Sequence, residues 1–169
     1  KAIDRADFVR EEFKEHSYIN QALPIGLEQT ISQPLTVAFM LELLEPKPGE
    51  KILDIGAGSG WQTALLAEII GQSRINVDNK QMTADNHGRI VAIERIPEIL
   101  EFAKTNLLKY QFQNINLVSG DGSKGFQEDA PYDKIIAAAA AKEIPLAWKE
   151  QLKIGGRIVT PINESIIIL

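Results

Sequence analysis

The sequence predicts an α/β fold of the doubly wound class, with a mostly parallel sheet and helices on both faces. Short apolar runs alternate with amphipathic helical stretches, a glycine-rich turn joins the first run to the next helix, and no internal repeat interrupts the pattern. Strands and helices that alternate in this way form right-handed βαβ units. The glycine turn then lies at the carboxyl end of the first strand, where such sheets bind ligands.

The predicted elements follow a mixed, polar segment over residues 1–30. A helix is predicted over 35–44, because proline precedes its start and a Pro-Lys-Pro-Gly stretch ends it. A strand at 51–55 precedes the glycine turn and a helix at 61–70 follows it. Further strands are predicted at 89–93, 115–118, 134–138 and 156–160, and further helices at 97–109 and about 145–152.

Asp54 closes the first strand, and the turn after it carries three glycines, Gly56, Gly58 and Gly60. Glycine lets the backbone approach a ligand closely, and the N–H groups that open the next helix are expected to point at that ligand. A dinucleotide fingerprint would need glycine where Trp61 stands. The pattern therefore favours S-adenosylmethionine, and the alternative is a tight turn with no ligand.

Acids near the ends of the strands are candidates for contacts with this cofactor. Glu94 can accept hydrogen bonds from both ribose hydroxyls, or it is a surface acid that caps the next helix. Asp121, between two glycines, can accept from the adenine amino group, or it forms a plain Asp-Gly turn. Asp54 can face the amino group of the methionyl portion, and it can also fix the N–H groups of its own turn.

The stretch 29–34, Gln-Thr-Ile-Ser-Gln-Pro, places two hydroxyls and two amides in front of a helix. A helix N-terminus of this kind favours a carboxylate ligand. The plainer interpretation is that Ser32 is the N-cap of a helix with proline in its first turn. Both interpretations stay open from the residues alone.

Composition argues against several classes of chemistry. The net charge of −5 and the lack of a Lys/Arg cluster disfavour nucleic acid. With no cysteine, and with His16 and His87 far apart, neither a thiolate nucleophile nor a metal site is expected. No signal peptide or membrane-spanning run is visible, so the cytoplasm is the expected compartment.

Methyl transfer to a carboxylate needs only alignment and partial desolvation, because the acceptor is already ionised.

Residues 72–87 do not fit the alternation of strands and helices, because they are polar and form a long connection. We expect a mobile insertion without a catalytic role at the sheet edge opposite the ligand, with oligomer contact as the alternative. We expect one domain, with a cap or substrate segment at 1–49 and a cofactor-binding core at 50–161. The start at Lys1 and the apolar run at 166–169 suggest that both ends are truncated.

These motifs together resemble the protein-L-isoaspartate O-methyltransferase family. The resemblance implies a class I methyltransferase fold and S-adenosylmethionine-dependent methylation of the α-carboxylate of L-isoaspartyl residues in damaged proteins. The ester then collapses to a succinimide, part of which reopens as normal aspartate. The resemblance rests on Leu-Pro-Ile-Gly at 23–26, the 29–34 stretch, the glycine turn, Gly-Asp-Gly at 120–122, and segments at 132–133, 143–145 and 151–157.

The resemblance also implies roles for individual residues. Ser32 matches the active-site serine, whose expected role is positioning rather than nucleophilic attack. We expect a monomer that acts on isoaspartyl proteins and peptides, with no metal. The implied cofactor contacts are Gln29, Thr30, Ile31, Ser32, Asp54, Gly56, Ala57, Gly58, Gly60, Glu94, Arg95, Asp121 and Gly122.

Two residues depart from the family pattern. Glu28 stands where the family usually has glycine, which puts an acid beside the expected carboxylate pocket. Ala138 stands where the family usually has threonine, which removes a hydroxyl near the substrate. Two alternatives are therefore kept: a methyltransferase of another small-molecule acceptor, and a non-catalytic domain that binds the cofactor.

Overall fold

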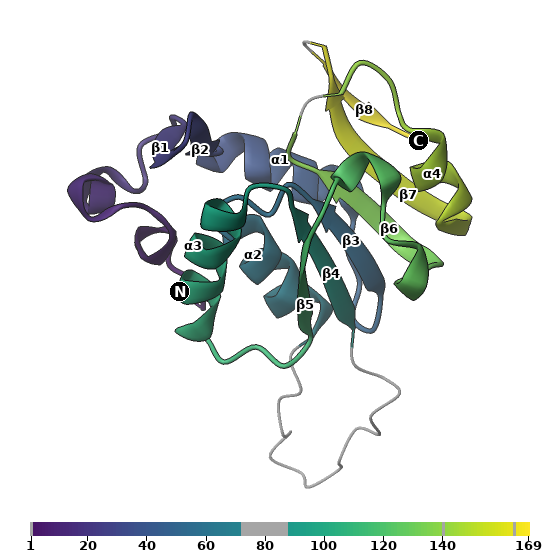
Figure 1. Ribbon diagram of the computed structural model, residues 1–169, viewed down its shortest axis with the longest axis horizontal. Helices are drawn as coiled ribbons and strands as arrows, with labels where there is room; N and C mark the ends of the chain where they lie inside the picture. Colours follow the sequence, from purple (N-terminus) through teal and green to yellow (C-terminus); the bar gives the residue numbers. More distant parts are fainter. Residues whose placement is uncertain (1, 72–87, 140, 164) are drawn as a thin grey trace, which may run out of the picture.

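A computed structural model of the protein describes residues 2–71, 88–139, 141–163 and 165–169 (Figure 1). Six strands form its main sheet, and the predicted insertion at 72–87 lies outside the described residues. The strands of this sheet are β3 (Lys51–Ile55), β4 (Arg89–Glu94), β5 (Ile115–Ser119), β6 (Tyr132–Ala137), β7 (Leu152–Ile162) and β8 (Ser165–Ile168).

The order of the strands is β5-β4-β3-β6-β7-β8. All neighbouring pairs are parallel except β7–β8, which is antiparallel. The predicted doubly wound, mostly parallel fold is therefore confirmed, and the apolar run that ends the chain forms β8. The chain order changes direction between β3 and β6, so the carboxyl ends of these two strands flank the expected ligand crevice.

Helices cover both faces of the sheet (Figure 1). Ile52 and Ile90 point to the face that α1 and α2 cover, and α3 packs beside α2. Leu53 and Val91 point to the opposite face, where they pack with Trp148 of α4. Because both faces are buried, the strands are continuous apolar runs. The helices are α1 (Pro34–Leu44), α2 (Trp61–Ile70), α3 (Pro97–Leu108) and α4 (Leu146–Glu150).

Most predicted boundaries agree with the structure to within two residues. The strand at 51–55 and the helix at 61–70 agree residue for residue, because proline and glycine mark their ends. β7 is longer than its predicted 156–160. A register shift on β6 between Tyr132 and Lys134 lets pairing begin at Leu152, and β8 extends the pairing at the other end.

The first 31 residues contain a β-hairpin that the sequence did not predict. Its strands are β1 (Leu23–Gly26) and β2 (Gln29–Ile31), which pair antiparallel. Leu27 and Glu28 connect them with φ of +50° and +59°. Tight hairpins favour Gly, Asn or Asp at such positions, so Leu-Glu gives no turn signal. The hairpin follows two 3-10 helices, η1 (Arg5–Phe8) and η2 (Glu11–His16).

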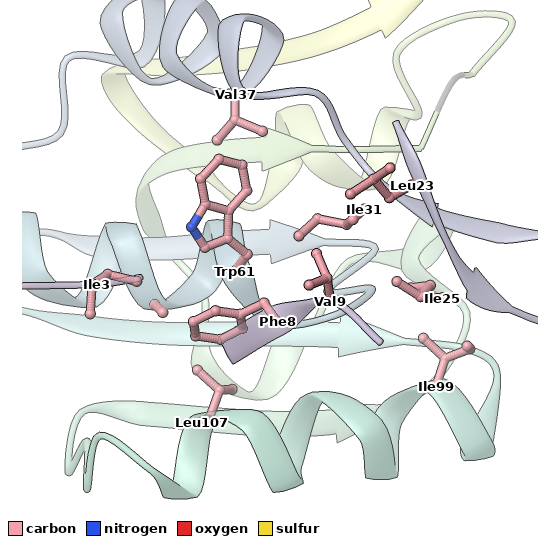
Figure 2. Close-up of a cluster of buried hydrophobic side chains, with 11 residues drawn as sticks. Ile3, Phe8, Val9, Leu23, Ile25, Ile31, Val37, Trp61, Ile99 and Leu107 are labelled. Carbon is pink, nitrogen blue, oxygen red and sulfur yellow. The ribbon is translucent and has the colours of Figure 1, made fainter. Parts of the chain in front are cut away.

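A buried apolar cluster attaches this N-terminal segment to the sheet helices (Figure 2). Phe8 and Val9 pack with Ile99 and Leu107 of α3, and Trp61 of α2 lies in the same cluster. Figure 2 shows the indole ring with Val37 on one side and Phe8 on the other. The hairpin is thereby held beside the start of α2, which directly follows the glycine turn.

Candidate functional site

The carboxyl ends of the parallel strands bring the predicted cofactor residues to one edge of the sheet. The Asp54 turn follows β3, Glu94 ends β4, and Asp121 follows β5. A cavity of about 300 Å³ opens at this edge, and its volume suits a small-molecule ligand. We call it the larger cavity, in contrast to a small cavity that adjoins it. The predicted residues that line the larger cavity are Gln29, Gly56, Glu94, Arg95, Asp121 and Gly122.

A second cavity, of about 30 Å³, adjoins the first because Gly56 lines both. This smaller cavity lies where the 29–32 stretch meets the glycine turn, and Val37 and Trp61 give it apolar walls. Asp54 and Gly60 line neither of the two cavities. The predicted residues that line the smaller cavity are Thr30, Ile31, Ser32, Gly56, Ala57 and Gly58.

The glycines of the turn serve different purposes. Gly56, Gly58 and Gly60 have φ of +82°, +56° and +85°, which favour glycine. An added Cβ at Gly58 would lie 3.8 Å from its nearest neighbour, which is an ordinary contact distance, so the positive φ rather than a lack of room requires glycine here. At Gly60 an added Cβ would lie 3.1 Å from Leu107 Cγ, so this glycine allows α2 to pack against α3. Gly56 and Gly58 therefore form the ligand-facing part of the turn.

The N–H groups of this turn bond within the protein. Gly56 and Ala57 both donate to the carbonyl of Ile93, at 2.9 and 3.0 Å, and Gly60 donates to the carbonyl of Ala57 at 2.8 Å. Trp61, the first residue of α2, donates to Ser59 Oγ at 3.4 Å. The expectation concerned the N–H groups that open α2, and among the groups named here it is wrong only for Trp61. What the turn offers a ligand is close approach of its backbone.

Glu94 links the end of β4 to the glycine turn. Its Oε2 accepts from Gly58 N at 3.1 Å, and its Oε1 accepts from Arg95 N at 2.9 Å and Ile96 N at 3.0 Å. The side chain is buried, so the alternative of a surface acid is wrong. A carboxylate has about four acceptor sites, which leaves about one for a hydroxyl donor in the larger cavity. The predicted bonds to both ribose hydroxyls stay a prediction.

Asp54 is fully buried behind the turn. Its Oδ1 accepts from Gln62 Nε2 at 2.8 Å and its Oδ2 from Thr63 Oγ1 at 2.6 Å. Burial raises the pKa of Asp54 to about 6, although both hydrogen bonds act to lower it. Asp54 therefore holds side chains at the start of α2, rather than the N–H groups of its own turn as expected. Gln62, which donates to Asp54, lines the smaller cavity, whereas Asp54 itself does not.

Asp121 makes the Asp-Gly turn that the sequence offered as an alternative. Its Oδ1 accepts from Ser123 N at 3.0 Å and Ser123 Oγ at 2.8 Å, and these bonds lower the pKa of the exposed Asp121 carboxyl. The side chain nonetheless lines the larger cavity. An added Cβ at Gly122 would overlap Ile55, so the glycine lets this loop approach β3 closely.

Ser32 is not the N-cap of α1, which corrects the plainer interpretation of that residue. The N-cap is Gln33, whose side chain makes no capping bond. Asn20, from the N-terminal segment, supplies the cap instead, because its Oδ1 accepts from Leu35 N at 3.0 Å. The Ser32 side chain is half-buried and lines the smaller cavity. Gln29, three residues earlier, lines the larger cavity.

The two departures from the family pattern differ in position. Glu28 is exposed at the tip of the hairpin and lines neither cavity. Its φ of +59° explains why glycine would suit this position. Ala138 lines the smaller cavity together with Ser32, so a hydroxyl at 138 would face the same space.

Several lining residues were not identified from the sequence. Trp148 of α4 lines the larger cavity, and its Nε1 donates to the carbonyl of Gly122 at 2.8 Å. Trp61 and Gln62 line the smaller cavity. Trp61 and Gln62 could have been identified from the sequence, because they directly follow the glycine turn. Trp148 could not, because only the packing of α4 brings it to the site.

The residues present fit an S-adenosyl ligand. The left-handed backbone at Gly56 and Gly58 lines the cavities without a side chain, and the Glu94 carboxylate keeps an acceptor site at the larger cavity. The described parts of the chain contain no helix with the length and apolar character to cross a membrane. Within those same parts, no three His, Cys, Asp or Glu side chains gather in a way that could hold a metal ion.

Comparison with known proteins points to one family. The sequence model of the protein-L-isoaspartate(D-aspartate) O-methyltransferase family matches residues 1–167. The protein-L-isoaspartate O-methyltransferase of Staphylothermus marinus is 42% identical over 98% of this chain and 70% of its own length. Its counterpart in Aeropyrum pernix is 47% identical over 95% of this chain and 57% of its own length.

Solved structures agree with this match. A protein-L-isoaspartate O-methyltransferase structure superposes with a TM-score of 0.79 at 31% identity, over 95% of this chain and 48% of that one. A Plasmodium falciparum structure in complex with S-adenosyl-L-homocysteine has the same fold, with a TM-score of 0.78 at 22% identity, over 99% of this chain and 76% of that one. The chain therefore belongs to the protein-L-isoaspartate O-methyltransferase family, a family of S-adenosylmethionine-dependent protein carboxyl methyltransferases.

Proposed function

We propose that the larger cavity binds S-adenosylmethionine and that the smaller cavity admits the α-carboxylate of an L-isoaspartyl residue beside Ser32. One observation carries this assignment: Gly56 lines both cavities, so a donor in one and an acceptor in the other share a boundary. The predicted cofactor contacts divide accordingly. Gln29, Glu94, Arg95, Asp121 and Gly122 serve the larger cavity, while Thr30, Ile31 and Ser32 serve the boundary with the acceptor.

The side chains of this site perform little proton chemistry in the proposed reaction. When bound, S-adenosylmethionine supplies a methyl group that is already activated for a one-step displacement. The acceptor carboxylate is ionised at neutral pH, so it needs no general base. Ser32 donates a hydrogen bond to one carboxylate oxygen and thereby fixes the orientation of the other. Ile31, Val37 and Trp61 exclude water from the smaller cavity, which partly desolvates the acceptor.

The proposal extends to the organisation of the chain. The segment 1–49 forms the acceptor side and 50–161 the cofactor-binding core, because the hairpin contributes Thr30 to Ser32 while the strand ends contribute Glu94 and Asp121. We also propose a monomer that works in the cytoplasm. Glu28 is not part of the acceptor pocket in this scheme, and Ala138 occupies its wall.

A paired-peptide assay tests the proposed function. An isoaspartyl peptide and its aspartyl twin of identical sequence are incubated separately with the protein and methyl-labelled S-adenosylmethionine. Only the isoaspartyl peptide should become labelled, because the two differ in which carboxylate is free. Ala138→Thr is the informative variant, and labelling that rises with it would identify the missing hydroxyl. Equal labelling of both peptides, or of neither, would contradict the proposal.

A further inference from the structure

One arginine is completely buried beside the site without belonging to the site as described above. Arg5, in η1, has 0% of its surface exposed. Its guanidinium donates to three backbone carbonyls of the 17–32 stretch: Ser17, Gln21 at 3.2 Å, and Ser32 at 2.9 Å. One side chain thus connects the start of the chain to the residue that faces the acceptor.

The same guanidinium lies over an aromatic ring that lines the smaller cavity. Arg5 Cζ is 5.1 Å from the centroid of the Trp61 ring, which is within the range of a cation–π contact. Trp61 and Ser32 both line the smaller cavity. Arg5 therefore contacts two walls of the smaller cavity from behind, one through a hydrogen bond and one through a ring face.

Burial of this charge is compensated by the geometry around it. A buried cation is costly unless hydrogen bonds replace its hydration, and here three carbonyls do so for the two terminal nitrogens of Arg5 and the ring face adds to them, while Nε has no acceptor among the described residues. Burial lowers the pKa of Arg5 from its ordinary value, but a guanidinium stays protonated in proteins. A planar guanidinium can reach several carbonyls and stack on an indole at once, whereas an ammonium cannot.

Arg5 is itself held in place. Its backbone N–H donates to Tyr18 Oη at 3.0 Å, and Asp4 accepts from Ala6 N at 3.0 Å at the start of η1. Phe8, at the end of η1, is fully buried and stacks on Tyr110 with ring centroids 5.6 Å apart. The guanidinium is therefore presented from a fixed element rather than from a loose end.

We propose that Arg5 is a positioning residue for the acceptor side of the site. It sets the Ser32 peptide at a fixed place relative to Trp61, and so fixes where the Ser32 hydroxyl meets the acceptor carboxylate. This inference rests on the proposed function. It predicts that the loss of Arg5 weakens acceptor recognition more than cofactor binding, because Glu94 and Asp121 stand on strand ends that Arg5 does not contact.

The matched pair of variants is Arg5→Met and Lys109→Met. Lys109 Nζ donates to the carbonyl of Asp7 at 2.7 Å, so it ties the same N-terminal segment to the end of α3 from the outside, away from Ser32. Arg5→Lys is the conservative variant, since it keeps the charge and the length to reach one carbonyl. Both Met variants lose a cation that holds the segment, but only Arg5→Met releases the Ser32 peptide.

Three quantities are measured for each variant: the KM and kcat for the isoaspartyl peptide, the Kd for S-adenosylhomocysteine by calorimetry, and hydrogen exchange of the backbone amides at 29–33. Arg5→Met should raise the acceptor KM at least tenfold, keep the Kd within about threefold, and speed exchange at 29–33. The acceptor KM of Arg5→Lys should be at least threefold lower than that of Arg5→Met. Lys109→Met should match the wild type in all three quantities.

Two results would overturn the inference. One is a Kd for S-adenosylhomocysteine that rises in parallel with the acceptor KM, which would make Arg5 a general stabiliser. The other is an unchanged KM or unchanged exchange at 29–33 in Arg5→Met. A wild-type protein that labels neither peptide would defeat the proposed function instead. The exchange comparison between Arg5→Met and Lys109→Met would then decide alone whether Arg5 holds Ser32.

Discussion

The two sides of the site are built in different ways. The strand-end side consists of the Asp54–Gly60 turn, Glu94 and the Asp121–Gly122 pair, each at or just beyond the carboxyl end of a parallel strand. The hairpin side consists of residues 29–32, which lie at the site only because distant residues hold them there. Arg5 bonds to Ser32 across 27 residues, and Asn20 caps α1 across 15.

This difference shows which parts of a site depend on local rules. On the strand-end side, the fold class alone determines where these residues lie, because the carboxyl ends of parallel strands meet at one edge of the sheet. Its polar groups are largely satisfied inside the protein, as the bonds of Glu94 and Asp54 illustrate. On the hairpin side, long-range contacts and the left-handed residues Leu27 and Glu28 set the geometry. The larger effects on stability are therefore expected on the first side, and the effects on acceptor recognition on the second.

The largest expected effect is a loss of stability at the third glycine of the turn. Gly60→Ala should lower the free energy of unfolding by roughly 2–4 kcal/mol, because it adds a left-handed alanine and crowds Leu107. Urea unfolding measures this loss. Gly155→Ala is the control, since Gly155 has φ +77° but nothing within 4 Å of an added Cβ. Equal losses in the two variants would show that α2–α3 packing does not require Gly60.

The next effect is a pH dependence that comes from Asp54. Its pKa of about 6 in the folded protein exceeds its ordinary value of 3.8, so between these pH values the folded state holds a proton that the unfolded chain has released. Asp54 should therefore lower the unfolding free energy by up to about 3 kcal/mol as pH rises from about 4 to 6. Urea unfolding of wild type and Asp54→Asn at pH 4.5 and 6.5 isolates this change. If the difference in unfolding free energy between wild type and Asp54→Asn is the same at both pH values, Asp54 is not the source of the pH dependence.

On the hairpin side, Ser32→Ala should lower turnover of the isoaspartyl peptide by roughly 30-fold, because a hydrogen bond to a charged group contributes about 2 kcal/mol. Affinity for S-adenosylhomocysteine should stay nearly intact. The unfolding free energy should change by less than about 0.5 kcal/mol, since Ser32 is not a cap. Asn20→Ala, which removes the observed cap, should cost about 1 kcal/mol. If Ser32→Ala instead lowered the unfolding free energy by about 1 kcal/mol and Asn20→Ala left it unchanged, Ser32 would be the cap of α1.

The smallest expected effect is a gain of stability at the hairpin tip. Glu28→Gly should raise the unfolding free energy by about 0.5–1 kcal/mol, because glycine adopts positive φ without the steric penalty that glutamate has. Glu28→Ala removes the charge but keeps the penalty, so it should gain nothing. Thermal unfolding distinguishes the two variants. If both raise the acceptor affinity equally, the Glu28 charge does act on the acceptor pocket.

The sequence predicted the strand-end side closely and the hairpin side only as a motif. The alternation of strands and helices placed Glu94, Asp121 and the glycine turn together, and the structure agrees. It could not predict that Asp54 would face Gln62 and Thr63, because a carboxylate's partners depend on how α2 packs.

The hairpin escaped prediction because Leu27 and Glu28 are unusual turn residues. Arg5 gave no signal either, since one arginine in a polar segment looks like a solvated charge until its carbonyl partners are known. In both cases the information lies in contacts between residues far apart in the chain, which local patterns do not contain.

A crystal structure of the protein with S-adenosylhomocysteine would show where the cofactor binds. We expect the ribose to lie against Glu94 in the larger cavity and the thioether sulfur to face the smaller cavity across Gly56. If the product lies elsewhere, such as between α3 and β5, or turns its sulfur away from Ser32, the proposed arrangement of donor and acceptor is wrong.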